Sequence, residues 1–253
     1  MKKIFKVIII CLFSLITYTK AESKTEITTE DGIEVFQNEK YYLLKKNVRI
    51  DSDSFTLDAD NVKINFDKSL YDIMEFNANG DVDFNSDTYE MSGHGEFLKF
   101  EVKKQKIKVE GQNSKLISND IQMFSDGFIE VNNLNGNFSL KGFNSKLVNE
   151  DIVIQAKSID GIFSDIENKK EITSLKVYDQ KIAYIKNNDT EMFAKRINYN
   201  NDSAIIELIE NVVIIRNDEK IIGDYGSLDT INNSYKIQSK DQSKVKVIIQ
   251  NNE

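Results

Sequence analysis

The sequence of 253 residues contains no proline and no tryptophan, and it has one cysteine (Cys11) and one histidine (His94). A disulfide scaffold, a zinc ribbon and a Cys/His catalytic pair each need residues that this chain lacks. The formal net charge of −8 argues against nucleic acid as a partner, because phosphates call for a basic surface. Hydrophobic residues still make up 40% of the chain, which is enough to bury a substantial core.

The first 21 residues differ in character from the rest. Lysines precede an apolar run over 7–16, which is short of the roughly 20 residues that a membrane span needs. A polar stretch then leads to Ala21. This pattern predicts a signal peptide over 1–21, cleaved after Ala21, with a retained anchor or another cleavage site as the alternatives.

Cleavage would remove four lysines and no acidic residue, so the mature charge would be −8 − 4 = −12. It would also remove Cys11, so that stability would come from packing and sheet hydrogen bonds alone. No later stretch of the sequence is long and apolar enough for a transmembrane helix. In a Gram-negative cell we therefore expect a periplasmic product.

The mature chain alternates apolar and polar residues almost throughout, as in 62–66 (VKINF) and 245–247 (VKV). A period of two predicts strands with one buried and one solvated face. Clusters of Asn, Asp, Ser and Gly separate the runs, as turns require. The sequence therefore predicts an all-β fold.

The strands also recur with a regular spacing. Runs begin every 30 to 35 residues, at Val48, Val82, Leu116, Leu147, Ile182, Val212 and Val245. The first six are each followed by a second run that ends in a small residue, which suggests a bend or a close backbone approach. Such a period predicts stacked supersecondary units, and no linker interrupts them, so we expect one domain over 22–253.

A stack of strands leaves a free sheet edge at each end, and unpaired backbone groups there recruit other strands. The last run carries Val245, Val247 and Ile249 and contains no proline that would block pairing. We expect it to be a docking edge for strand addition.

Two segment pairs resemble the OstA-like repeat of the LptA family of lipopolysaccharide transport proteins. The first consists of 59–67 (ADNVKINFD) and 80–84 (GDVDF), and the second of 194–200 (AKRINYN) and 210–214 (ENVVI). A further copy is 223–229 (GDYGSLD), whereas 111–170 lacks a clear core motif. The resemblance extends over the mature chain and is clearest in 45–85 and 191–240.

The resemblance implies an elongated open β-jellyroll (a β-taco) of tandem repeats. It implies a lipopolysaccharide-binding bridge whose groove shields the acyl chains of lipid A. It also implies head-to-tail assembly with LptC-like and LptD-like jellyroll domains, and end-to-end self-association. No cofactor, metal or catalytic activity is expected of such a component.

Some large apolar side chains are candidates for the groove lining, although ordinary core packing has the same sequence pattern. They are Phe66, Phe84, Phe100, Phe138, Phe163 and Ile214.

Other chemistry finds little support in the sequence. We expect His94, between two glycines, to be a turn residue, and Asp81 with Asp83 to be solvated. No calcium loop with its fixed glycine is present, and Arg residues are few and scattered, which argues against a polysaccharide lyase on a β-helix. A structural or adhesive β-repeat protein and an LptC-like anchored component remain the alternatives.

Overall fold

The computed structural model describes residues 25–68, 72–166, 169–217, 219–232, 234–240 and 244–249. The predicted signal peptide over 1–21 and its cleavage after Ala21 lie outside these residues. Within them the chain is all-β, as the alternation predicts, apart from one 3₁₀ turn. The elements are β1 (Thr25–Thr28), β2 (Ile33–Phe36), β3 (Tyr41–Ser52), β4 (Thr56–Phe66), β5 (Ile73–Ser86), β6 (Met91–Glu101), η1 (Val102–Lys104), β7 (Lys106–Glu110), β8 (Ser114–Ser118), β9 (Ile121–Ser125), β10 (Phe128–Asn132), β11 (Asn137–Asn149), β12 (Ile152–Ile166), β13 (Lys169–Asn187), β14 (Thr190–Asn200), β15 (Ile205–Arg216), β16 (Glu219–Asp229), β17 (Ser234–Gln238) and β18 (Lys246–Ile249).

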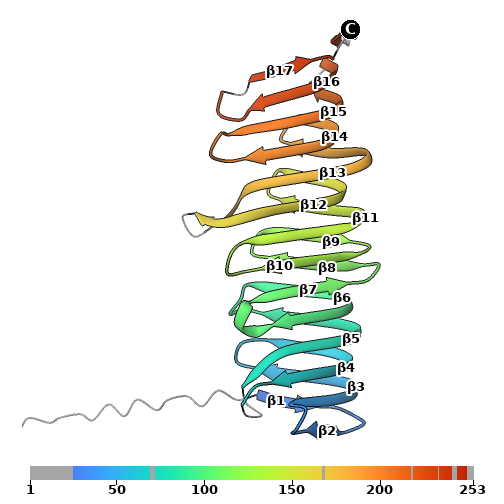
Figure 1. Cartoon of the computed structure of the whole chain (residues 1–253), viewed down its shortest axis with the longest axis vertical. Coiled ribbons are helices and arrows are strands. Elements are labelled where there is room, and N and C mark those ends of the chain that lie inside the picture. The colour runs from blue at the N-terminus through green and yellow to red at the C-terminus, as the bar shows by residue number, and fades with distance from the viewer. Residues whose placement is uncertain are drawn as a thin grey trace, which may run out of the picture.

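The strands stack in chain order along the long axis of the molecule, with β1 and β2 at one end and β16 to β18 near the other (Figure 1). Every pairing between them is antiparallel, and most long strands pair with the strands before and after them in the chain. The stack is therefore built from local hairpins, which is the arrangement that the repeat of 30 to 35 residues predicts.

The sheet is folded over on itself, because each long strand bends near its middle. The register shifts at corresponding places, such as Lys45/Val48, Asn79/Val82 and Ile209/Val212. One half of each long strand thus lies in a first wall, which includes β2, β7, β10 and β17. The other half lies in a second wall, which includes β1, β8, β9 and β18. We call the line of bends the spine and the opposite edge, where the turns lie, the mouth.

The spine explains the repeat motif. The two residues before Val82 are Gly80 and Asp81, with φ of 76° and 44°, and Glu210 and Asn211 stand in the same place before Val212 with φ of 66° and 57°. Glycine and asparagine tolerate this left-handed backbone better than other residues do. A Cβ at position 80 would also lie 2.1 Å from Asp60 Oδ2, so a larger residue there would have to displace the Asp60 side chain.

The small residues that close the second runs lie beside the spine. Ala59, Ala156 and Ala194 are buried there and each lies close to a register shift. The two walls converge at the bends, and a large inward side chain would not fit between them. The expectation that small residues mark bends is confirmed.

The middle of the stack is built differently, in line with its degenerate motif. Around β7 to β10 the chain crosses between the walls through short loops at 111–113 and 126–127 instead of through bent strands. Gly111 has φ of 128°, and a Cβ on Gly127 would lie 2.2 Å from the carbonyl oxygen of Lys141. These crossings replace the usual corner at 111–113 and 126–127, whereas β11 and β12, which also lie within 111–170, still bend at Lys141/Ser145 and Gln155/Ser158.

The turns at the mouth are tied to one another along the first wall. The backbone N–H of Phe163 donates to Gly136 O at 3.0 Å, and that of Thr230 donates to Ala204 O at 2.9 Å. Such bonds hold neighbouring repeats in register. The mouth is therefore an ordered edge, and the apolar core lies between it and the spine.

Candidate functional site

The interior between the two walls is the principal candidate site. Inward residues alternate with outward ones along each strand, and the buried apolar side chains form one cluster that extends from Leu44 to Leu228. All six predicted groove residues face this interior and are at most 8% exposed. Lining of a lipid groove by these residues remains a prediction.

Aromatic rings fill the interior of the first repeats. Phe100 lies 5.5 Å from Phe84 and 5.4 Å from Tyr89, ring centre to ring centre, and Phe76 lies 4.9 Å from Phe55. Phe84, Tyr89 and Phe55 come from the second wall, whereas Phe76 and Phe100 come from the first. Such edge and tilted contacts add about 0.5–1.5 kcal/mol per pair beyond the burial of area, so these rings join the two walls.

Two further predicted residues form a smaller aromatic contact. Phe138 stacks on Phe163 with a centroid distance of 5.9 Å and an interplanar angle of 9°. Both belong to the first wall, on β11 and β12. The remaining two are separate from this pair: Phe66 contacts Tyr42 near the amino-terminal end, and Ile214 lies far along the stack on β15.

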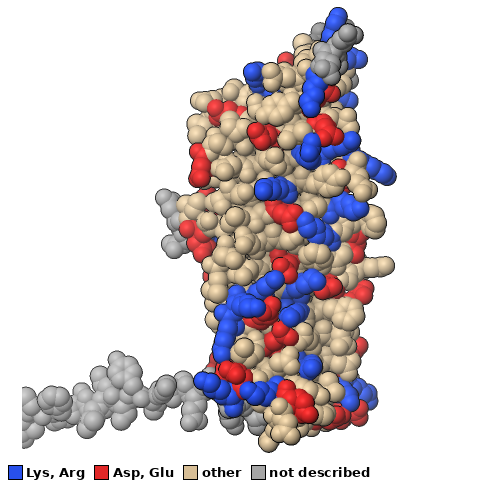
Figure 2. All heavy atoms as spheres, in the orientation of Figure 1, with Lys and Arg blue, Asp and Glu red and all other residues tan. Residues whose placement is uncertain are grey.

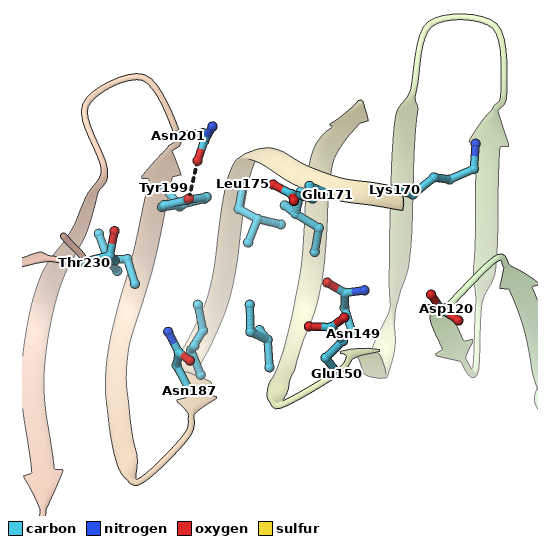
Figure 3. A pocket seen from close by; sticks show the side chains of 14 residues that line it. Asp120, Asn149, Glu150, Lys170, Glu171, Leu175, Asn187, Tyr199, Asn201 and Thr230 are labelled. Atoms are coloured by element: carbon cyan, nitrogen blue, oxygen red, sulfur yellow. Dashed lines mark hydrogen bonds between the residues drawn. The ribbon is translucent and has the colours of Figure 1, made fainter. Parts of the chain in front are cut away.

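The interior of the later repeats is mainly aliphatic and contains a cavity of about 320 Å³. Leu175 and Ile206 line it from the first wall, and Ile152 and Ile185 line it from the second. Figure 3 shows these strands with their turns at the two opposite sides of the cavity. The cavity therefore opens at the mouth and reaches into the core.

The rim of this cavity is polar. In the second wall, Asn149 and Asn187 end β11 and β13 and Glu150 lies in the turn after Asn149, whereas Tyr199 and Asn201 come from the first wall (Figure 3). The Tyr199 hydroxyl donates to Asn201 Oδ1 at 2.9 Å. Amides, hydroxyls and carboxylates thus surround an apolar opening, which is an arrangement that suits an amphiphile.

Lys170 is the lysine of this rim, and its ammonium group is already engaged. It donates to Asn133 Oδ1 at 2.9 Å, lies 3.5 Å from Asp165 Oδ1 and sits 4.8 Å from the centre of the Phe163 ring. Its side chain is 7% exposed and extends away from Tyr199 (Figure 3). The ammonium group of Lys170 therefore interacts with Asn133, Asp165 and Phe163 and not with the cavity opening.

Negative charge dominates the rest of the rim. Asp120, Glu150 and Glu171 all line the cavity. Burial raises the pKa of Tyr199 above its ordinary value, and the negative charge of Glu171 raises it further. The tyrosine thus stays protonated at neutral pH and keeps its hydroxyl as a hydrogen-bond donor.

The two ends of the stack carry short strands with exposed apolar side chains. At the carboxyl end β18 pairs with one half of β16, and Val247 and Ile249 are 54% and 64% exposed. The predicted strand begins one residue later than the sequence suggests, so Val245 precedes it. At the amino end, Ile33 on β2 is similarly exposed. A docking role for either end remains a prediction.

The prediction that His94 is a turn residue is wrong. It lies within β6, and its Nδ1 is 2.9 Å from Asp83 Oδ1 on β5. The neighbouring glycines face inward at the spine, where a Cβ on Gly95 would lie 2.5 Å from Val109 Cγ1. They therefore serve close packing of the walls and not a loop.

The outer face of the second wall carries a row of charges across neighbouring strands. Arg49 donates to both carboxylate oxygens of Asp58, and Asp58 lies beside Asp83 in the register. Asp81 and Asp83 are both exposed, as predicted. In the described part of the chain no cluster of three metal-ligating side chains is found, and no helix is long and apolar enough to cross a membrane.

Acidic and basic side chains are intermixed over the face of the molecule that Figure 2 shows, without one extended patch of either sign. Glu210 on the bend of β15 forms ion pairs with Lys195 and Arg196. Hydrogen bonds from Lys195 and the charge of Arg196 keep the pKa of this carboxyl below its usual value.

Sequence reasoning missed the residues of the cavity and its rim. Leu175, Ile185 and Tyr199 follow the same alternation as every other inward residue, so nothing in their spacing distinguishes them. The available signal was the change from Phe to Ile and Leu at inward positions along the chain.

These features define a class: an elongated, folded-over β-sheet of tandem repeats with a continuous apolar interior. Residues 26–133 match the family described as "LptA/(LptD N-terminal domain) LPS transport protein". This match confirms the resemblance to LptA/OstA-like lipopolysaccharide transport proteins that the repeats suggested.

No curated protein matches the chain. A solved structure that aligns with it is LptH of Pseudomonas aeruginosa, described as the LptA homologous periplasmic component of the conserved lipopolysaccharide transport device. The alignment covers 90% of this chain and 96% of LptH at 9% identity, with a TM-score of 0.23. A TM-score this low adds nothing to the fold, which follows from the strand pairings of this chain.

Proposed function

We propose that the protein is a periplasmic component of lipopolysaccharide transport that shields the acyl chains of lipid A between its two walls. The observation that carries the proposal is the continuous apolar interior of a folded-over sheet, which has a polar mouth along one side. In this view the folded-over sheet is the open jellyroll expected from the repeats. The family match over 26–133 supports the same role.

The burial of apolar surface alone is enough for such a site to bind an acyl chain. Each CH₂ group that leaves water contributes about 0.8 kcal/mol, so an acyl chain gains several kcal/mol in an apolar lining without any specific contact. Most of the interior is packed with side chains, and the cavity of the later repeats is open space within it. Binding therefore requires the walls to separate at the mouth, with the spine as the hinge.

The charge of the protein sets a further condition. After removal of 1–21 the net charge is −8 − 4 = −12, whereas the lipid head carries phosphates. The overall field repels the ligand, and apolar burial provides the attraction. Weak binding of this kind suits a conduit, because a tight site would hold the lipid and stop its movement.

The ends of the stack are the proposed assembly surfaces. β18, with Val245, Val247 and Ile249, would pair with LptC-like or LptD-like domains or with the amino-terminal end of another copy. Its exposed apolar side chains and unpaired edge support this role.

The lipid-binding part is tested by photo-crosslinking in cells at Phe84, Phe138 and Phe163. We expect covalent lipopolysaccharide adducts at these inward positions. The matched controls are the outward neighbours on the same strands, Ser139 and Ser164, which should give none. Adducts with protein alone at all three inward positions would contradict lipid binding and favour a structural β-repeat.

The assembly part is tested by deletion of 244–253. The strand in this segment contacts only one half of β16 and is mostly exposed, so the remaining sheet should keep its β-type circular dichroism. Co-purification with partner domains should be lost. Loss of the fold itself would contradict the proposal, because it would make β18 part of the core.

A further inference from the structure

The cavity of the later repeats is small compared with a lipid that carries several acyl chains. Its volume of about 320 Å³ is at the lower end of the roughly 300–1,000 Å³ that small-molecule sites enclose. Leu175, Ile185 and Ile206 give it an aliphatic wall, and the one aromatic ring among its described lining residues is that of Tyr199 at the rim. This space fits one alkyl chain inserted from the mouth.

The rim determines which head group can accompany that chain. Asp120, Glu150 and Glu171 place negative charge around the opening, and the ammonium of Lys170 is directed to Asn133 and Asp165. A phosphate at this opening would lie among carboxylates, and the one cation among the described lining residues, Lys170, is already bound to its own partners. Like charges at close range are unfavourable, most of all where the surroundings are partly apolar.

The same rim is well suited to hydroxyl groups. Amide side chains of Asn149 and Asn187 and the Tyr199 hydroxyl lie around the opening, together with the carboxylates. Carboxylates accept hydrogen bonds from sugar hydroxyls, and amides both donate and accept. The amides and carboxylates of the rim thus complement the hydroxyl groups of an uncharged sugar.

We propose that this cavity is an entry site for one alkyl chain of a glycolipid, whose uncharged sugar lies on the rim while charged phosphates stay outside it. The proposal rests on the proposed function and adds to it the location of entry and the part of the lipid that is contacted. The chain inserts between β12 and β15, and the head group lies against the turns of both walls.

The test uses the chain without residues 1–21 and two probes with the same alkyl chain, dodecyl maltoside and dodecyl phosphate. Isothermal titration calorimetry is done below the micelle concentration and at low ionic strength. We expect one maltoside per protein, and about tenfold weaker binding of the phosphate because of the rim carboxylates. Equal or tighter binding of dodecyl phosphate would overturn the proposal.

Variants locate the site. Glu171→Gln should reduce the difference in affinity between dodecyl maltoside and dodecyl phosphate. Glu130→Gln, on the outer face of the first wall beside Lys106, should leave this difference unchanged. Leu175→Phe and Ile206→Phe should each abolish binding of both probes, and Val213→Phe on an outward position of β15 should not. Melting temperatures show which variants are folded. Undiminished binding by both folded cavity variants would overturn the site.

The outcomes also separate this proposal from the proposed function. Lipopolysaccharide adducts at Phe84 and Phe138 without any binding of dodecyl maltoside would refute the entry site and leave lipid transport intact. Binding of dodecyl maltoside without lipopolysaccharide adducts would support the cavity and contradict the transport role.

Discussion

The early repeats, β3 to β6, and the later repeats, β12 to β16, have the same fold but different interiors. In the early repeats, rings such as Phe84 and Phe100 reach across from opposite walls and contact one another. In the later repeats, Leu175, Ile185 and Ile206 surround open space. The same strand periodicity thus supports both a closed, aromatic region and a region with room for a ligand.

This difference separates two tasks within one sheet. Aromatic contacts between the walls oppose their separation, so the early repeats act as a clamp. The later repeats lack the bulk to fill their interior, so separation of the walls there breaks fewer contacts. Four predictions test this comparison, starting from the largest expected effect.

Removal of an aromatic ring from the early repeats should destabilise the protein far more than removal of an aliphatic side chain beside the cavity. Phe100→Ala should lower the free energy of unfolding by about 3–5 kcal/mol, and Leu175→Ala by about 2 kcal/mol, because the leucine already borders open space. Urea unfolding measures both. Equal losses would contradict the comparison.

Addition of volume should have opposite effects in the two regions. Ala78→Leu, in the packed interior of β5, should cost about 2 kcal/mol through overpacking. Leu175→Phe should stabilise the protein by about 0.5–1 kcal/mol through cavity filling. Thermal unfolding distinguishes the two signs, and destabilisation by both substitutions would mean that the cavity is not available space.

The spine corners differ as well, since Gly80 and Asp81 form one corner of the early repeats and Glu210 and Asn211 form one of the later repeats. Gly80→Ala should cost about 2 kcal/mol, because alanine disfavours a positive φ and meets Asp60. The matched control is Gly32→Ala, which has φ of 90° but no atom within 4 Å, and should cost less. An equal loss of stability in the two variants would mean that the contact with Asp60 does not contribute to the effect at Gly80.

The smallest effect concerns acid stability of outward carboxylates. Burial acts to raise the pKa of Asp160, but hydrogen bonds from Lys141, Ser139 and Ser158 outweigh it and the pKa is lowered from 3.8. Its contribution to stability is thus present above pH 3.8 and is lost as the pH falls through the lower folded value. Asp160→Asn should remove this part of the acid sensitivity.

We expect the contribution of Asp160 to be only about 0.5 kcal/mol, because its side chain is 43% exposed. Glu75 on β5 is the counterpart in the early repeats: burial again acts to raise its pKa, and bonds from Asn77 and Lys99 lower it overall. Glu75→Gln, like Asp160→Asn, should remove part of the loss of stability at acid pH, as measured by unfolding at a series of pH values. A gain of stability on lowering the pH would contradict both assignments.

Much of the fold could be predicted from the sequence, for a physical reason. Alternation records which side of a strand is buried, and Gly80 with Asp81 before Val82 records a left-handed corner. Both are local properties, so the all-β stack, the bends and the burial of Phe84 and Ile214 follow from short segments.

The cavity was harder to predict from the sequence, because it depends on contacts between segments that are distant along the chain. Leu175 and Ile185 have the pattern of ordinary core residues, and only the folded walls show that space remains between them. His94 was mistaken for a turn residue because its glycine neighbours suggest a loop, whereas they permit close wall packing within a strand.

The most direct test of the account measures the width of the mouth with pairs of spin labels. The only cysteine, Cys11, lies in the predicted signal peptide, so the mature chain offers a clean background. One pair is Asn187→Cys with Asn201→Cys beside the cavity, and the control pair is Asp87→Cys with Lys104→Cys near the aromatic clamp. On addition of lipopolysaccharide, the account predicts a longer distance for the pair beside the cavity and a smaller increase for the control pair, where the aromatic contacts oppose separation of the walls. An unchanged distance beside the cavity, or a larger increase at the control pair, would contradict it.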